Sequence, residues 1–207
     1  MSSASLAAYV VAGAGLVGLV TAGLSFMADQ PWGTLNDGAL LVLTAALAPL
    51  MLSFYELGGR TPTRLAQLAQ TLGWVSVLTF CVIQVLQMAG AVVIDWDTAA
   101  RGAFGVGSGA LVYIGLWIAG ANLLAGPWLN QLRWLGVAAG VAGVLYAAGL
   151  LLGGVDTGWT SLGGIAYLIL LPAWAFLMAR LLGHRSTVLP LGTRTKGDPG
   201  PPRAIRG

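Results

Sequence analysis

The chain has 207 residues, of which 57% are hydrophobic and only 8% are charged, and its mean hydropathy is +0.83. Soluble domains carry about 25% charged residues, so this chain has too few charges to cover a globular surface. The composition therefore excludes a soluble enzyme, a disordered chain and a nucleic-acid-binding domain, although the net charge is +3. A single-domain integral membrane protein remains, and we expect no nucleic acid as a partner.

Reactive side chains are rare, which limits the chemistry that the chain can perform. It contains one cysteine, Cys81, one histidine, His184, and one lysine, Lys196. A metal or iron–sulfur site needs several cysteine or histidine ligands, and one cysteine forms no intramolecular disulfide. Lys196 lies beyond the last apolar segment, so no Schiff base is expected within the membrane. We therefore expect no metal, no cofactor and no catalytic residue, which is more typical of a non-enzyme.

Six uncharged stretches are each long enough to cross a bilayer, which takes about 20 helical residues. Connections rich in breakers and caps, such as Asp29-Gln30-Pro31-Trp32-Gly33, separate them. The first stretch is too apolar and too long for a signal peptide, so we expect it to remain in the mature protein. The sequence predicts an all-α, polytopic six-transmembrane-helix bundle in residues 1–182. Its predicted helices cover 6–28, 38–55, 65–94, 104–125, 134–153 and 160–182.

The distribution of Lys and Arg predicts the orientation of the bundle. Nine of the ten lie on one side, which holds the N-terminus, the loops around Arg60 and Arg133, and the C-terminal segment. Only Arg101 lies on the opposite side. Short loops rich in Lys and Arg stay in the cytoplasm, so both termini are predicted to be cytoplasmic.

The C-terminal segment 183–207 changes in character, because it is rich in Pro and Gly, basic and without periodicity. Such composition favours a mobile cytoplasmic tail. Its basic residues are explained either by orientation alone or by contacts with anionic lipid headgroups, worth about 1 kcal/mol per residue near the surface. The candidate lipid contacts are Arg180, Arg185, Arg194, Lys196, Arg203 and Arg206.

A polar seam follows the third predicted helix, where residues recur in alternating steps of three and four and so share one face. Amides in hydrocarbon are costly without hydrogen bonds, so we expect this face to point into the bundle. The seam comprises Gln67, Gln70, Trp74, Val77, Cys81, Gln84 and Met88. Further polar candidates near it are Gln87, Tyr113, Asn122 and Tyr146.

Two interpretations of this face remain open. The amides either bridge helices, at about 0.6–2 kcal/mol per hydrogen bond, or line a cavity for a small neutral solute. The central part of the membrane carries no titratable acid or base, so proton pumping and voltage sensing lack their usual residues.

Small residues and one proline predict how the helices pack. Ala14, Gly18 and Ala22 lie one turn apart, as do Gly136 and Gly140. Such spacing allows close contact between helices, either inside the bundle or with a partner. Pro172 is expected to kink or loosen the sixth helix because it removes one backbone hydrogen bond.

Two segments carry a resemblance to a known group. The run Trp128–Gly140 and the passage Leu170-Leu171-Pro172-Ala173-Trp174 resemble segments of uncharacterised bacterial six-helix integral membrane proteins, grouped as a domain of unknown function. The resemblance implies a multi-pass protein of the bacterial cytoplasmic (inner) membrane and transfers no catalytic residue.

The function expected from these features is a non-catalytic accessory or structural membrane protein, which packs with a second copy or within a larger membrane complex. The alternative is a carrier or substrate-binding subunit for a small neutral or apolar solute, which would use the polar face of the third helix. The lipid bilayer is the other expected partner of the chain.

Overall fold

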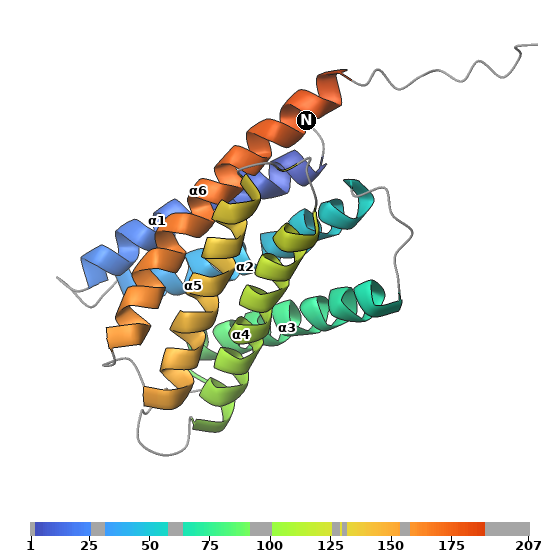
Figure 1. Cartoon of the computed structure of the whole chain (residues 1–207). Helices are drawn as coiled ribbons and strands as arrows, with labels where there is room; N and C mark the ends of the chain where they lie inside the picture. The colour runs from blue at the N-terminus through green and yellow to red at the C-terminus, as the bar shows by residue number, and fades with distance from the viewer. Residues whose placement is uncertain are drawn as a thin grey trace, which may run out of the picture.

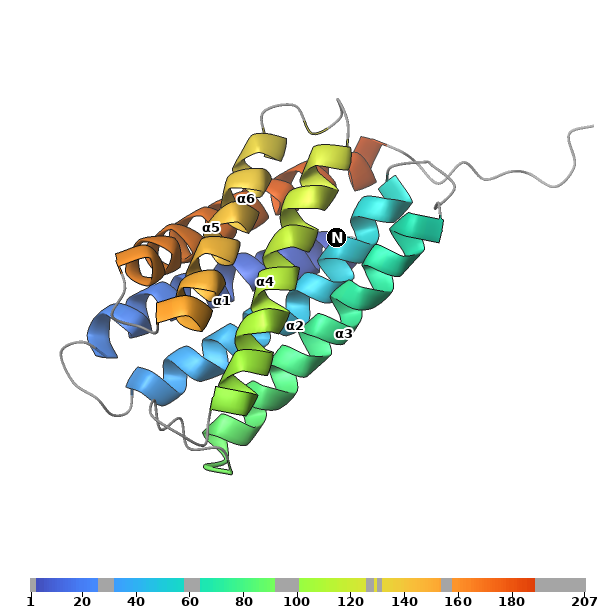
Figure 2. The ribbon, with the colours of Figure 1, turned by 60° about the horizontal axis from the view of Figure 1, so that its bottom comes forward.

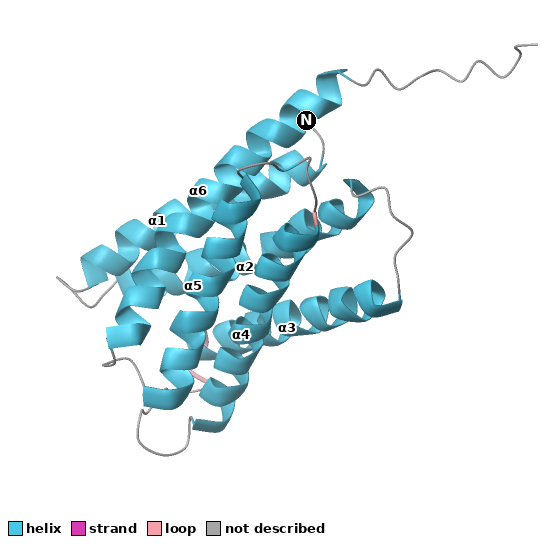
Figure 3. Cartoon of the chain, in the orientation of Figure 1, coloured by secondary structure: helices cyan, strands magenta, loops and turns pink. Residues whose placement is uncertain are grey.

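The computed structural model describes residues 3–25, 32–57, 64–91, 101–125, 129, 132–153 and 158–188. Within these residues the fold is all-helical (Figure 3), and all six helices are long and apolar enough to cross a membrane. The predicted all-α fold with six such helices is confirmed. The helices are α1 (Ser3–Ser25), α2 (Trp32–Leu57), α3 (Arg64–Met88), α4 (Arg101–Leu124), α5 (Leu132–Gly153) and α6 (Gly158–Val188).

The six helices form a closed ring. Each packs against its neighbours in the chain, and α1 packs against α6 to close the circle (Figures 1 and 2). Among neighbouring helices, α3 has the least extensive contacts, with both α2 and α4. Only 22% of its apolar, membrane-spanning segment is buried, against 56% of that of α4. Figures 1 and 2 show α3 diverging from α4 toward its Arg64 end. Helix α3 is therefore the least firmly held member of the ring.

Glycines set the closest helix contacts. A Cβ atom added at Gly115 of α4 would lie 2.7 Å from the carbonyl oxygen of Gly140 in α5, so the two backbones touch. Lipid-immersed helices gain dispersion energy from such close approach, since burial of apolar surface provides little drive between them. The small residue at position 140 thus serves packing inside the bundle.

Pro172 lies within α6, which continues on both sides of it. Its buried ring lies directly against Gly15 of α1, where any Cβ atom would overlap it. A second link between the same helices is the hydrogen bond that the Ser5 hydroxyl donates to the Ala179 carbonyl oxygen, at 3.1 Å. The proline therefore sits at a packed contact between α1 and α6.

Helix α3 ends earlier than the sequence range 65–94 predicted, at Met88. Gly90 adopts a φ of 68°, in the left-handed region that favours glycine. The Gly90 amide donates to the Gln87 carbonyl at 3.0 Å, and the Ala91 amide donates to the Leu86 carbonyl at 2.9 Å. This pair of bonds is a Schellman cap, which terminates a helix even where the following residues are apolar.

Two other boundaries differ from the prediction by six residues, whereas the remaining ones agree with it to within three. Helix α2 begins at Trp32, six residues before the predicted start, and so includes Asn36 and Asp37. Polar residues are tolerated in the first turns of a membrane helix because these turns lie near the interface. A prediction from hydropathy leaves such residues out of the helix. Helix α6 continues to Val188, beyond the predicted end at 182, because the next strong helix breaker is Pro190.

Candidate functional site

The buried face of α3 is turned relative to the predicted seam. Its buried positions are Gly73, Val77, Phe80 and Gln84, which again follow steps of three and four. The predicted seam agrees at Gln70, Val77 and Gln84, which lie on or beside this face. It differs at Gln67, Trp74 and Met88, which are exposed, with Trp74 exposed to 40%.

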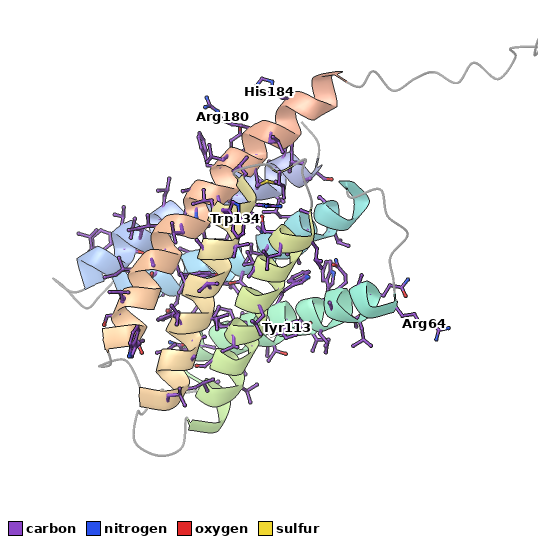
Figure 4. The ribbon with its side chains drawn as sticks, in the orientation of Figure 1. Arg64, Tyr113, Trp134, Arg180 and His184 are labelled. Atoms are coloured by element: carbon purple, nitrogen blue, oxygen red, sulfur yellow. The ribbon has the colours of Figure 1, made fainter. Side chains whose placement is uncertain are left out.

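The contact between Gly73 and Trp117 of α4 explains this orientation. A Cβ atom at Gly73 would lie 2.5–2.7 Å from three carbon atoms of the Trp117 indole, so only glycine admits the ring at this distance. One turn before Trp117, the Tyr113 hydroxyl donates to the Ala69 carbonyl oxygen of α3 at 3.2 Å. Two aromatic residues of α4 thus hold the first half of α3 (Figure 4 labels Tyr113).

Several polar atoms along this interface are buried without a hydrogen-bond partner among the described residues. They are both amide atoms of Gln70, the Trp117 indole nitrogen and the Gln84 amide oxygen. A buried donor or acceptor left unpaired costs about 1–3 kcal/mol. At these atoms the hydrogen bonds required by the interhelical interpretation are not formed. We define Gln70, Gln84 and Trp117 as the α3–α4 polar seam.

Cys81 and Gln87, also among the predicted candidates, are half-buried on the same helix. The backbone carbonyl of Gln87 accepts the Gly90 amide in the cap that ends α3. The exposed Gln67 contributes its backbone carbonyl to a hydrogen bond from the Thr71 hydroxyl, at 3.0 Å. The Gln67 side chain is exposed and lies outside the α3–α4 polar seam.

Asn122 lies at a different junction, between α4, α5 and α6. Its side chain is fully buried, and its Nδ2 donates to the Ile118 carbonyl oxygen at 2.9 Å. Its Oδ1 accepts a hydrogen bond from the Trp174 indole nitrogen of α6, at 3.1 Å. Gly136 of α5 packs directly against the same amide. Both amide atoms have a hydrogen-bond partner, so Asn122 bonds α4 to α6 and packs against α5.

Tyr146, the remaining predicted candidate, lies on α5 with its ring against Gly164 of α6, 3.1 Å from the Cβ position. In the reciprocal contact, the ring of Tyr167 of α6 lies against Gly143 of α5. Tyr167 was not among the predicted candidates, nor were Asn36 and Asp37 of α2, which are half-buried. Asp37 precedes buried Thr44 by seven residues, and this helical spacing is the signal that could have placed it inside.

The basic residues with described side chains are Arg64, Arg133, Arg180 and His184, of which Figure 4 labels three. The Arg133 guanidinium lies 4.9 Å from the Trp134 ring centroid, and that of Arg180 lies 5.3 Å from the Phe176 ring centroid. Such cation–aromatic pairs suit an interface, where the ring is in lipid and the charge is in water. The Arg185 side chain and the candidates Arg194, Lys196, Arg203 and Arg206 lie outside the described part of the chain.

The described residues contain no group of three or more His, Cys, Asp and Glu side chains that could hold a metal ion. Comparison of the chain with protein-family models, curated proteins and solved structures finds no match. The geometry of the α3–α4 polar seam is therefore the basis for a functional proposal.

Proposed function

We propose that this chain is a non-catalytic membrane protein that binds a small neutral polar solute between α3 and α4, as a carrier or as the binding subunit of a larger complex. The observation that supports it is the α3–α4 polar seam, with an amide, an amide oxygen and an indole N–H that have no hydrogen-bond partner among the described residues. The Gln70 amide lies one turn before Gly73, where the Trp117 indole packs, so these two groups can donate to and accept from one ligand without any net charge. Gln84 lies about 21 Å further along α3 and is too distant to contact the same small solute. The Gln70 and Trp117 groups suit a compound that carries an amide, alcohol or urea-like group.

The weak packing of α3 provides the route to these groups. Their atoms are enclosed in the ring, so a solute reaches them only when α3 moves away from α4. The α3 contacts are the weakest between neighbouring helices, which favours α3 as the element that moves. Solute binding would satisfy the unpaired atoms and so offset part of the free energy of opening.

A thermal-stability screen of the purified chain against neutral metabolites and lipids tests this proposal. We expect at least one polar compound to raise the melting temperature of the wild type. Gln70→Leu should abolish that shift with little change in basal stability, since leucine fills a similar volume and removes an unpaired amide. Gln67→Leu is the matched control, because Gln67 is exposed on the same helix, and it should respond like the wild type. If no compound stabilises the wild type, the solute-binding role is refuted.

An accessory role without a solute is the second candidate. Gly105 and Gly109 lie one turn apart on α4, with no atom within 4 Å of either Cβ position. Two glycines at this spacing, each with open space at its Cβ position, admit a second membrane helix, so the chain would dock on a partner or on another copy. Gly109→Ile should then disperse a complex isolated from native membranes while leaving the thermal-shift response unchanged. Migration of wild type and variant as the same single chain would exclude this role.

We further propose that the protein lies in the bacterial cytoplasmic membrane with both termini in the cytoplasm, and that Arg180, Arg185 and the basic C-terminal segment contact anionic lipids. The nine-to-one distribution of Lys and Arg supports this orientation. In a Cys81→Ala background, an impermeant thiol reagent applied to intact cells should label a cysteine at Gly158 and spare one at Thr193. The reverse labelling would overturn the orientation.

A further inference from the structure

An exposed group of aromatic and basic side chains joins α1 to α6 on the outside of the ring. The ring of Tyr9 in α1 meets the ring of Phe176 in α6 edge to face, with the two ring centroids 6.2 Å apart. The Arg180 guanidinium lies 5.3 Å from the centroid of the same Phe176 ring. All three side chains are exposed. We define Tyr9, Phe176 and Arg180 as the α1–α6 aromatic cluster.

Close packing of α1 on α6 holds this cluster in place. On one side of the aromatic pair, the Ser5 hydroxyl donates to the Ala179 carbonyl oxygen at 3.1 Å. On the other side, Gly15 packs directly on the ring of Pro172. The aromatic pair thus lies between two fixed points on both helices. A ligand that binds here would have to order little of the chain, which favours its affinity.

The length of α6 places Arg180 at a surface of the membrane. Trp159, near the start of α6, is exposed, as is typical of an indole at the bilayer interface. Arg180 follows it by 21 residues, or about 32 Å along a helix, and the hydrocarbon core is about 30 Å thick. The two residues therefore lie at opposite surfaces. Phe176, one turn before Arg180, lies at the edge of the hydrocarbon.

Arg180 presents a phosphate-binding group at the level of the lipid headgroups. Its guanidinium is planar, and its N–H groups suit a phosphate, which they bind through two hydrogen bonds. Neither α1 nor α6 contains an Asp or Glu residue, so no carboxylate of these two helices competes with a phosphate there. His184, one turn further on, extends outward from the same side of α6 as Arg180 (Figure 4).

An exposed apolar strip continues from the cluster into the membrane. Leu16 follows Tyr9 by seven residues on α1, and Ile169 precedes Phe176 by seven on α6, so each pair shares a helix face. The two helices run in opposite directions, so both residues lie on the deeper side of the cluster. Leu16 and Ile169 are each at least half exposed. An acyl chain along this strip leads directly to a phosphate on Arg180.

We propose that the α1–α6 aromatic cluster binds one anionic phospholipid, with its phosphate on Arg180 and an acyl chain along Tyr9 and Phe176. A single guanidinium matches a headgroup with one net negative charge, such as that of phosphatidylglycerol. The site deepens the lipid contact proposed above for Arg180, and it rests on the proposed orientation only for the leaflet that supplies the lipid. It differs from diffuse attraction to an anionic surface, because one lipid contacts both the charge and the rings.

Native mass spectrometry of the purified full chain tests this site, with phosphatidylglycerol or phosphatidylethanolamine titrated into the detergent. We expect one phosphatidylglycerol to bind more tightly than any further one. It should also bind about fivefold more tightly than phosphatidylethanolamine, whose net charge is zero, a ratio that corresponds to about 1 kcal/mol. Arg180→Gln should remove this preference. Arg133→Gln is the matched control, because Arg133 also lies beside an aromatic ring, 4.9 Å from that of Trp134, and it should bind like the wild type.

Tyr9→Leu tests the aromatic part of the site, since it keeps the charge and an apolar side chain but removes the contact with the Phe176 ring. It should weaken binding of the first phosphatidylglycerol about threefold. The melting temperature of each variant without lipid checks that the fold is intact.

The proposal fails if the first phosphatidylglycerol binds no more tightly than later ones, or if Tyr9→Leu binds it like the wild type. It also fails if Arg180→Gln and Arg133→Gln weaken binding equally, since diffuse charge attraction would then explain the binding. In detergent the chain has no inner or outer side, so such a failure would leave the proposed orientation intact. Reversed thiol labelling would refute the orientation and leave this site intact.

Discussion

The hydrogen bond between Asn122 and Trp174 offers the sharpest test of how the ring is held together. Both side chains are fully buried, and the bond joins α4 to α6 while Asn122 also bonds within α4. Trp174→Phe removes the donor and leaves the Asn122 oxygen without this partner. Asn122→Ala removes the acceptor and leaves space beside Gly136.

The structure sets the expected magnitudes. A hydrogen bond between membrane helices is worth about 0.6–1.7 kcal/mol, and leaving a buried partner unpaired costs about 1–3 kcal/mol. We therefore expect Trp174→Phe to lower the free energy of unfolding by about 2 kcal/mol and Asn122→Ala by about 2–3 kcal/mol. Each single value includes lost packing, so the coupling between them isolates the bond, and we expect about 1 kcal/mol.

Reversible unfolding in mixed detergent micelles, with all four chains of the cycle, measures this coupling. Trp134→Phe is the control, because Trp134 is largely exposed, and it should change stability by less than about 0.5 kcal/mol. Additive single effects, with no coupling beyond error, would contradict the assignment of Asn122 as a joint between helices.

Two further substitutions test local geometry by the same unfolding measurement. Gly140→Val should destabilise the chain by about 3 kcal/mol or more, because its Cβ would meet the Gly115 carbonyl oxygen; Gly120→Val, in open space, should be tolerated. Equal effects of the two would contradict the backbone contact. Gly90→Ala should cost about 1 kcal/mol, since φ is 68° and alanine is strained there. An unchanged free energy of unfolding in Gly90→Ala would show that the cap contributes nothing to stability.

The six apolar helices follow from composition, because each needs a long uncharged segment and the chain has few charges between them. Their ends do not follow from it. Asn36 and Asp37 read as part of a connection, yet they are helical and begin the buried face of α2. Hydropathy averages over all faces of a helix, so it cannot distinguish a polar residue in a loop from one inside the ring.

The candidate site was predictable only in its residue types. Polar residues on α3 were expected to face inward, and Gln84 and the amide of Gln70 are buried. Asn122 and Tyr146 belong to other junctions, which depend on how α4, α5 and α6 cross. Crossing geometry is set by glycine contacts such as Gly115 with Gly140, and a single sequence gives the spacing of glycines but not their partners.

The orientation of α3 shows how one such contact decides the outcome. Two buried faces are possible on this helix, and both contain Gln70, Val77 and Gln84. One passes through Trp74 and the other through Gly73. The expectation that polar side chains point into the bundle favoured the face through Trp74. The structure instead buries Gly73, because α4 can approach most closely where α3 has no side chain. Dispersion from that approach outweighs the burial of one more aromatic residue, which is equally well solvated by lipid.

This reasoning predicts a strong dependence of Gly73 on Trp117. Gly73→Ala places a methyl group 2.5–2.7 Å from three indole carbons, so α3 must move, and we expect a loss of about 1–3 kcal/mol. Trp117→Leu removes the ring and is itself destabilising through the cavity it leaves. In that background Gly73→Ala should have little effect or should stabilise, because the methyl group enters vacated space. A double-mutant cycle with a coupling of about 1 kcal/mol or more is therefore expected, and additive effects would mean that the α3–α4 contact does not set the orientation of α3.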